Sequence, residues 1–312
     1  MSKRTHIVAC LAGNGVGPEL MAEASRALAE VSALHGFRIE EMHVPFGGEG
    51  LSGYGHRLPA ATRAASRGAD AVLVASAKEP ALPGVRAGLE LCATVARVRS
   101  ASADLAVVSP LGELHKEWAV ELAFALARTR RGRVTALGAD HRWRELVERV
   151  GERHPAMEVV HTSPAAALPG LSAGGAGFDV IVTEEVFAEA VLQIATLAPE
   201  GRRAVAVGQI AERGPGLFGP VHGPAFEIAG QGVANPTGVL LAAALMLDEG
   251  LGERAAARTL ADGVAEAFRG GARTPDMHGT GAADTRSFMD AVLVQLPRTR
   301  TGDTEFGLGV VA

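Results

Sequence analysis

The stretch from residue 220 to residue 236 reads PVHGPAFEIAGQGVANP, and it combines glycines and prolines with His222, Glu227 and Asn235. Glycines let a backbone approach a ligand closely, a carboxylate suits paired sugar hydroxyls, and imidazole and amide groups can read the edge of a base. The stretch therefore indicates either a nucleotide-binding loop or an elaborate turn. At its end, Asn235 and Pro236 form a favourable helix entrance.

Around this stretch, short apolar runs alternate with helical patterns. Strands are predicted over residues 6–11, 71–75, 105–108, 134–137, 158–161 and 180–183. Helices are predicted over residues 113–131, 235–248, 253–268 and 286–295. Strand–helix alternation favours an α/β protein with a largely parallel sheet. The Gly-rich residues 169–177 predict a flexible loop, and residues 300–312 a loose tail.

The composition excludes several classes of protein. Of 312 residues, 47% are hydrophobic and 21% charged, and the formal net charge is −5. Disorder needs low hydrophobicity and high net charge, and a pI near 6.1 carries no general footprint for nucleic acid. No apolar run reaches the roughly 20 residues that span a bilayer. Two cysteines cannot build a disulfide framework, so we expect a cytoplasmic protein with neither nucleic-acid nor membrane partners.

A second glycine-rich stretch, GNGVGPE at residues 13–19, follows the first predicted strand. Its spacing departs from the dinucleotide-binding fingerprint G-x-G-x-x-G, because Pro18 stands where the last spacer belongs. The alternative is a tight turn that feeds a helix, whose first turn accepts Pro18 and Glu19 well.

These stretches resemble the β-decarboxylating hydroxyacid dehydrogenases, above all 3-isopropylmalate and isocitrate dehydrogenase. Residues 13–19 are similar to the family's GDGIGPE, and residues 222–236 to its HGSAPDIAGKGIANP. Residues 178–183 resemble FDVIVT, and residues 279–292 resemble the family's C-terminal helix. The resemblance spans nearly the whole chain, with a shortened middle.

The resemblance implies an isopropylmalate dehydrogenase-like, two-domain α/β fold that is not Rossmann, with parallel and mixed sheets and flanking helices. Residues 1–98 and 205–312 would form a large nucleotide-binding domain. Residues 99–204 would form a small domain that dimerises. The shortened middle includes the arm that clasps the two subunits in relatives, so the dimer would be less interlocked.

The same resemblance implies that the 222–236 loop holds the adenosine of NAD, with His222 and Asn235 facing adenine. Glu227 stands where NAD-using members carry an aspartate for the ribose hydroxyls. Its negative charge would repel a 2′-phosphate, which favours NAD over NADP. The cofactor-binding residues implied are His222, Gly223, Glu227, Ile228, Ala229, Gly230 and Asn235.

The family's metal positions are altered. Its helix FGDILSD aligns with residues 187–193, so Glu189 and Gln193 replace two aspartates. They share a helix face, but a carboxamide is a poor substitute for a carboxylate on Mg²⁺ or Mn²⁺. A third aspartate, given by the partner subunit in relatives, falls at Ser163. The metal is therefore doubtful, and Glu189 is alternatively an exposed helix carboxylate.

The family's acid–base groups are missing as well. The lysine would follow residues 134–137, where this chain reads GADHRW, and the tyrosine belongs to a segment that is absent. The single tyrosine, Tyr54, lies elsewhere. His115, His141 and His161 are either alternative acid–base groups or ordinary surface and packing histidines, so the catalytic residues stay unassigned.

The arginines that grip substrate carboxylates in the family are also fewer. Arg86 matches the first of a pair, whereas the second position falls on Ala96, beside Arg97. Ser109 replaces the arginine of the VREL motif. Arg86 and Arg97, with Arg99, could still form an anion pocket, or else Arg97 and Arg99 lie on a solvent-facing strand surface.

Three hypotheses follow. The first is an enzyme with an NAD site and altered, metal-independent chemistry on a small carboxylate-bearing molecule such as a 2-hydroxy acid. The second is a catalytically silent, nucleotide-binding regulatory or partner subunit. The third is that the loop is vestigial and the pocket binds another ligand. We expect a homodimer or a heteromer with a catalytic paralogue.

Overall fold

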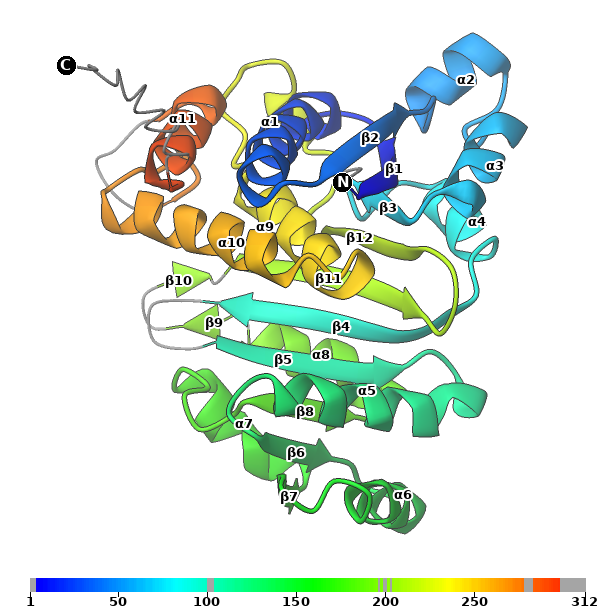
Figure 1. The fold of residues 1–312 in the computed structure, drawn as a ribbon, viewed down its shortest axis with the longest axis vertical. Coiled ribbons are helices and arrows are strands. Elements are labelled where there is room, and N and C mark those ends of the chain that lie inside the picture. Colours follow the sequence, from blue (N-terminus) through cyan, green and yellow to red (C-terminus); the bar gives the residue numbers. More distant parts are fainter. Residues whose placement is uncertain are drawn as a thin grey trace, which may run out of the picture.

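A ten-stranded mixed β-sheet runs through the molecule with helices on both faces (Figure 1). The computed structural model describes residues 4–99, 104–195, 197–198, 201–202, 204–277 and 283–297. The order of strands across the sheet is β2-β1-β3-β12-β11-β4-β5-β8-β6-β7. The predicted α/β class is confirmed.

The strands fall into two parallel groups joined by antiparallel strands. β1 pairs in parallel with β2 and β3, and β3 with β12, while β8 pairs in parallel with β5 and β6, and β6 with β7. β11 and β4 connect the groups through antiparallel pairs with β12, β5 and each other. The strands are β1 Thr5–Leu11, β2 Arg38–His43, β3 Ala71–Val74, β4 Leu91–Arg99, β5 Asp104–Pro110, β6 Arg133–Leu137, β7 Glu158–Thr162, β8 Val180–Thr183, β11 Ala204–Ala211 and β12 Gly216–Pro220, with a separate pair of β9 Leu197–Ala198 and β10 Gly201–Arg202.

One face of the sheet is covered by a single buried core to which α1, α5, α6, α9, α10 and α11 contribute. The opposite face has two cores, one with α4 and one with α7 and α8. The helices are α1 Gly17–His35, α2 Gly48–Tyr54, α3 Ala60–Gly68, α4 Leu82–Arg86, α5 Lys116–Arg128, α6 His141–Gly151, α7 Pro164–Ser172, α8 Glu185–Ala195, α9 Thr237–Leu245, α10 Arg254–Arg269 and α11 Thr285–Gln295, with 3₁₀ turns η1 Glu113–His115 and η2 Phe226–Ile228 and a π-helical turn η3 Met246–Gly250.

All six predicted strands are confirmed, as β1, β3, β5, β6, β7 and β8. The strands β2, β4, β11 and β12 were not predicted from the sequence. β2 reads RIEEMH and is the edge strand of the sheet, so its polar side chains disguise it. β4 is interrupted by Arg97 and Arg99, whose charges are neutralised by acidic partners.

The predicted loop over residues 169–177 is wrong in its first part, because α7 continues through Pro169 to Ser172. The hydroxyl of Ser163 caps this helix by accepting a hydrogen bond from the backbone N–H of Ala166 (3.2 Å). Ala167 and Leu171 are buried against the sheet, so packing offsets the backbone hydrogen bond that Pro169 cannot donate.

The predicted helix entrance at Asn235 is confirmed with a shift of one residue. α9 begins at Thr237, and Asn235 Oδ1 accepts the backbone N–H of Thr237 at 3.0 Å. The tight turn at residues 13–17 also feeds a helix as expected, with Pro18 in the first turn of α1. Residues 279–282 of the C-terminal motif and the predicted tail, residues 300–312, lie outside the described residues.

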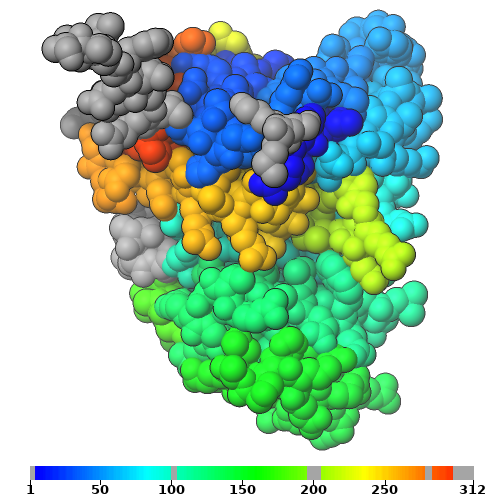
Figure 2. All heavy atoms as spheres, viewed as in Figure 1, coloured from blue at the N-terminus to red at the C-terminus, as the bar shows by residue number. Residues whose placement is uncertain are grey.

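The middle of the chain occupies one end of the molecule, whereas the N-terminal and C-terminal segments lie together at the other end (Figure 2). α1 packs against α9, α10 and α11, which brings the two distant segments into contact. The predicted domain limits fall at the end of β4 and the start of β11, and the division itself stays a prediction. No helix in the described ranges is long and apolar enough to cross a membrane.

Candidate functional site

The first part of the 222–236 loop is held by backbone hydrogen bonds at the carboxyl ends of β1 and β3. The backbone N–H of Val16 donates to the carbonyl of Pro224 (2.8 Å), and the N–H of Ala77 donates to the carbonyl of His222 (2.9 Å). Gly15 has φ +61°, and a Cβ there would lie 1.8 Å from the Pro224 carbonyl oxygen. The two glycine-rich stretches of the sequence are therefore one structure.

His222 lies against the first turn of α9 rather than in open solvent. Its Nδ1 is 3.0 Å from the carbonyl oxygen of Gly223. Its Nε2 is buried and has no hydrogen-bond partner among the described residues. Burial lowers the pKa of His222, so the imidazole is neutral at pH 7. A neutral imidazole suits the edge of an uncharged base better than a cation would.

The middle of the loop presents an exposed carboxylate and a glycine backbone. Glu227 lies in the 3₁₀ turn η2 and is exposed, and its backbone carbonyl accepts the side-chain amide of Gln231 (2.8 Å). Gly230 and Gly232 have φ values of +73° and +66°, with open space where a Cβ would stand. This cradle leaves room for a ligand beside Glu227.

The end of the loop is fixed by the C-terminal segment. Asn235 Nδ2 donates to Asp276 Oδ2 (3.0 Å), and the N–H of Thr285 donates to the carbonyl of Gly232 (2.7 Å). Asp276 did not stand out in the sequence, because 41 residues separate it from Asn235. The amide of Asn235 is thus oriented by its neighbours before any ligand arrives.

A second residue that the sequence did not reveal is Glu79, which is 3% exposed beneath the glycine turn. Its two carboxylate oxygens accept the backbone N–H and the side-chain amide of Asn14 (2.6 and 2.8 Å). Asn14 Oδ1 in turn accepts the N–H of Gly48 (2.7 Å). The pair therefore fixes the turn and ties it to α2.

A cavity of about 350 Å³ lies at the carboxyl ends of β5 and β8. Lys116 Nζ pairs with Glu113 (2.8 Å), and Glu185 accepts the N–H of Gly112 (3.0 Å). Three carboxylates face one ammonium here, which is a poor environment for a dicarboxylate substrate. The lining residues are Pro110, Gly112, Glu113, Lys116, Glu184, Glu185 and Val186.

α8 starts at the rim of this cavity and carries Glu189 and Gln193 one turn apart, both exposed. Among the described residues, no cluster of three His, Cys, Asp or Glu ligands includes Glu189. One carboxylate and one carboxamide offer little to Mg²⁺ or Mn²⁺, which favour several charged oxygens. The loss of the family's metal therefore stays a prediction from the residue types at these two positions.

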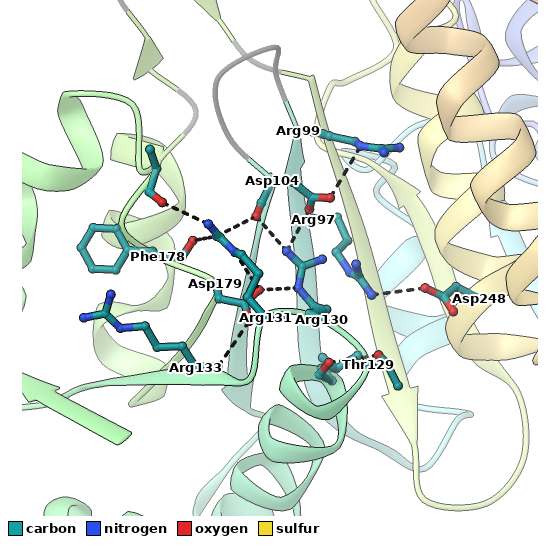
Figure 3. Close-up of polar contacts among 12 residues, drawn as sticks. Arg97, Arg99, Asp104, Thr129, Arg130, Arg131, Arg133, Phe178, Asp179 and Asp248 are labelled. Carbon is teal, nitrogen blue, oxygen red and sulfur yellow. Dashed lines mark hydrogen bonds and ion pairs between the residues drawn. The ribbon is translucent and has the colours of Figure 1, made fainter. Parts of the chain in front are cut away.

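The structure does not bring the two predicted substrate arginines into one pocket. Arg97 Nη2 contacts Asp248 of η3 (3.2 Å; Figure 3). It also contacts Glu249 of the same turn (2.8 Å). Arg86 belongs to α4, which packs on the opposite face of the sheet. Arg86 is exposed and has no ion-pair partner within the described ranges.

The remaining arginines of Figure 3 lie near the amino ends of β5, β6 and β8, and Arg99 lies at the carboxyl end of β4. Asp179, 1% exposed, accepts Arg130 Nε (2.8 Å) and the backbone N–H of Arg131 (2.9 Å). Burial of Asp104 opposes ionisation, but the charges of Arg130 and Arg99 outweigh it and lower the pKa of Asp104. This network is structural.

Of the residues considered as acid–base groups, His115 lies in η1 between the lining residues Glu113 and Lys116, and His141, His161 and Tyr54 do not line the cavity. His141 pairs with Glu145 on the exposed side of α6, and His161 lies 3.6 Å from Glu148. Tyr54 is 65% exposed at the end of α2. The residue with a titratable amine in the cavity is Lys116.

Comparison with known proteins gives this geometry a family. The model of the isocitrate/isopropylmalate dehydrogenase family matches residues 7–111 and 101–292. The chain belongs to the isocitrate/isopropylmalate dehydrogenase family. It is 32% identical to 3-isopropylmalate dehydrogenase of Synechococcus sp. (strain CC9605), covering 88% of this chain and 94% of that protein. It is 31% identical to the enzyme of the same name from Bacillus cereus (strain ATCC 14579), covering 95% and 97%.

Solved structures of the family share the fold. A β-decarboxylating dehydrogenase from Thermococcus kodakarensis in its apo form superposes with a TM-score of 0.81 at 23% identity, covering 93% of this chain and 96% of that one. An isocitrate dehydrogenase from Methylococcus capsulatus gives a TM-score of 0.78 at 22% identity, covering 93% and 99%. The resemblance stated from the sequence motifs is confirmed.

Proposed function

We propose that this member of the isocitrate/isopropylmalate dehydrogenase family binds NAD at the 222–236 loop and does not carry out metal-dependent oxidative decarboxylation. NAD, when bound, supplies hydride transfer. Glu227 would accept hydrogen bonds from the adenosine ribose, while the Gly230 backbone lets the ligand approach. Asn235, held by Asp276, and the neutral His222 would contact adenine.

The observation that carries the proposal is the contrast between a complete loop and an incomplete metal helix. The loop is locked by Gly15, by Thr285 and by the cap of α9, and it exposes one carboxylate in an open cradle. Glu189 and Gln193 on α8 supply too few charges for a divalent cation. The relatives are named for a dehydrogenase reaction, and this chain retains the half of it that concerns the nucleotide.

For the substrate, we propose a small carboxylate-bearing molecule bound by Arg86, which is at an exposed position and has no ion-pair partner among the described residues. Such a carboxylate would pair with Arg86 through two parallel hydrogen bonds. General acid–base groups typically contribute about 10²- to 10⁴-fold each, so the loss of the family's lysine and tyrosine leaves little of the ancestral reaction.

A second candidate, a silent nucleotide-binding subunit, is favoured by the lining of that cavity. Glu113, Glu184 and Glu185 would repel an anionic substrate, with Lys116 alone opposing them. Such a subunit would assemble with a copy of itself or with a catalytic paralogue. The measured mass in solution, alone and with an active relative, distinguishes these assemblies.

The proposal is tested by titrating NAD and NADP into the purified chain by calorimetry. We expect NAD to bind more tightly than NADP. Glu227→Ala should lower the affinity for NAD about tenfold, equivalent to about 1.4 kcal/mol. It should also reduce the ratio of the NAD affinity to the NADP affinity, because the charge that repels the 2′-phosphate is gone. Glu212→Ala, an exposed glutamate in the loop between β11 and β12, is the matched control and should change neither affinity.

Equal NAD affinity of the original chain and Glu227→Ala would refute the assignment of the loop. Turnover is measured separately, with 3-isopropylmalate or isocitrate, NAD and Mn²⁺. Formation of NADH at rates typical of dehydrogenases, about 1 to 10³ s⁻¹, would refute the loss of the family reaction. An NADH signal that appears only with another 2-hydroxy acid would favour the altered enzyme over the silent subunit.

A further inference from the structure

Cys10, Glu41 and His43 lie together at the edge of the sheet, beneath α1. β1 and the edge strand β2 pair in parallel with Cys10 opposite His43 and Val8 opposite Glu41. Residues in these register positions share one face of the sheet, and Val8 and Cys10 belong to the core that α1 covers. The Cys10 Sγ, a Glu41 carboxylate oxygen and a His43 ring nitrogen all lie within 4.8 Å of one another.

Three donors converge on one oxygen of this cluster. Glu41 Oε2 lies 2.5 Å from Ser25 Oγ on α1, 2.9 Å from His43 Nε2 and 3.9 Å from Cys10 Sγ. The carboxylate is therefore oriented from the helix side by the Ser25 hydroxyl. Ligands held by a hydrogen bond in this way are typical of metal sites in proteins.

The exposure of the three side chains increases from Cys10 through Glu41 to His43, so an ion can reach the cluster from solvent on the His43 side. Cys10 is 1% exposed, and the side chains of Glu41 and His43 are 17% and 56% exposed. Burial, together with the adjacent Glu41 carboxylate, raises the pKa of the Cys10 thiol well above its usual range. The thiol is thus protonated until a cation offsets the charge of Glu41.

We propose that Cys10, Glu41 and His43 bind a divalent cation of the Zn²⁺ class, with water as the fourth ligand. Tetrahedral bonds of about 2.3 Å to sulfur and 2.0 Å to nitrogen require the two atoms to be about 3.5 Å apart, which a small rotation of the exposed His43 side chain provides. Binding would release the Cys10 proton to solvent, as ligand thiols do on metallation.

The ligand types determine which cation binds, and they distinguish this site from the family's metal positions on α8. Thiolate and imidazole favour Zn²⁺ and its spectroscopic substitute Co²⁺, whereas Mg²⁺ and Mn²⁺ favour carboxylate oxygens. Glu189 and Gln193 belong to α8, which covers the sheet beside β5, at a distance of many strands from β2. The site therefore neither replaces nor restores the family's catalytic metal.

The test uses the full, untagged chain, free of added metal, and titrates it with Zn²⁺ against a chromophoric chelator and with Co²⁺ by absorption. We expect one high-affinity ion per chain and a thiolate-to-Co²⁺ charge-transfer band. His43→Gln, at an exposed position that the fold does not need, should weaken Zn²⁺ at least about tenfold. Cys10→Ala should abolish the charge-transfer band.

Matched controls are available for each ligand type. Cys92→Ala removes the other buried thiol, and His141→Gln removes another exposed histidine that lies beside a glutamate. Both should bind Zn²⁺ like the original chain, as should Glu189→Gln. An affinity unchanged by His43→Gln, or a Co²⁺ complex without a sulfur band, would overturn the assignment. Because His43 is exposed, the first of these results is obtained even if Cys10→Ala fails to fold.

Discussion

The 222–236 loop and the rim of the cavity at the start of α8 differ in what holds them in place. The loop is shaped by backbone, since Val16 and Ala77 donate to its carbonyls and Gly15 has no space for a side chain. The cavity rim depends on side-chain contacts, such as the Lys116–Glu113 ion pair and the hydrogen bond from the N–H of Gly112 to Glu185.

This difference bears on which of the two regions tolerates substitution. A change at Gly15 would displace the loop and α1 with it, so binding and folding depend on the same atoms. An aspartate replaced on the exposed face of α8 leaves the helix intact, because surface substitutions typically change stability by less than about 0.5 kcal/mol. Catalytic chemistry at the rim can therefore be lost while the fold persists.

The largest loss of stability is expected when the ion-pair network of Asp179, Arg130 and Asp104 is disrupted. Asp179→Ala removes the buried carboxylate that Arg130 Nε and the backbone N–H of Arg131 share, and it leaves Arg130 with only the half-exposed Asp104 as a charged partner, which should destabilise the chain by about 3–5 kcal/mol. Urea unfolding measures the loss. The half-exposed Asp104→Ala should cost less than about 1 kcal/mol. Equal losses of stability for Asp179→Ala and Asp104→Ala would contradict the structural role of the buried Asp179 carboxylate.

Gly15→Ala should cause the second-largest loss of stability, about 2–3 kcal/mol, and should also abolish NAD binding. The left-handed φ and the contact with the Pro224 carbonyl both oppose a Cβ. Gly55→Ala separates the two causes, because Gly55 has a φ of +70° but open space around it. If both variants lose the same stability, the contact between the two glycine-rich stretches contributes nothing.

A smaller gain is expected when the metal helix is repaired. Gln193→Asp places a second carboxylate one turn from Glu189 and should raise Mn²⁺ affinity about three- to tenfold, since ligand charge governs the affinity for hard cations. Calorimetry with Mn²⁺ measures the gain, and Gln193→Asn is the neutral control. Tight Mn²⁺ binding by the unaltered chain at α8 would show that the present donor set suffices.

The smallest effect concerns pH. Burial lowers the pKa of His222 in the folded chain, so on acidification the unfolded chain takes up its proton first and stability falls. His222→Gln should remove this contribution, which is at most about 1.4 kcal/mol between pH 7.5 and pH 5.5. Urea unfolding at the two pH values gives the difference, and His161 contributes equally to both proteins. A steeper loss in the variant would contradict the sign.

Much of the fold was predictable because its signals are local. Six strands and the C-terminal helices follow from apolar runs and helical spacing, and Asn235 marks the start of α9 by its own side chain. β2 and β4 escaped prediction because Glu41 and Arg97 break the apolar pattern, and their partners lie on other elements. Pro169 led to the wrong prediction of a loop from residue 169, because the packing of Leu171 against the sheet keeps α7 helical despite the preference of proline for turns.

For the candidate site, the sequence alone determined the loop, its acidic residue and the altered positions on α8. These depend on residue types at fixed spacing, which a chain carries whether or not it is folded. The tertiary structure alone decided that Arg97 forms ion pairs with Asp248 and Glu249. It also decided that Cys10 lies beside Glu41 and His43. Such meetings depend on strand register and helix packing between segments at least 31 residues apart, and no local pattern encodes that register.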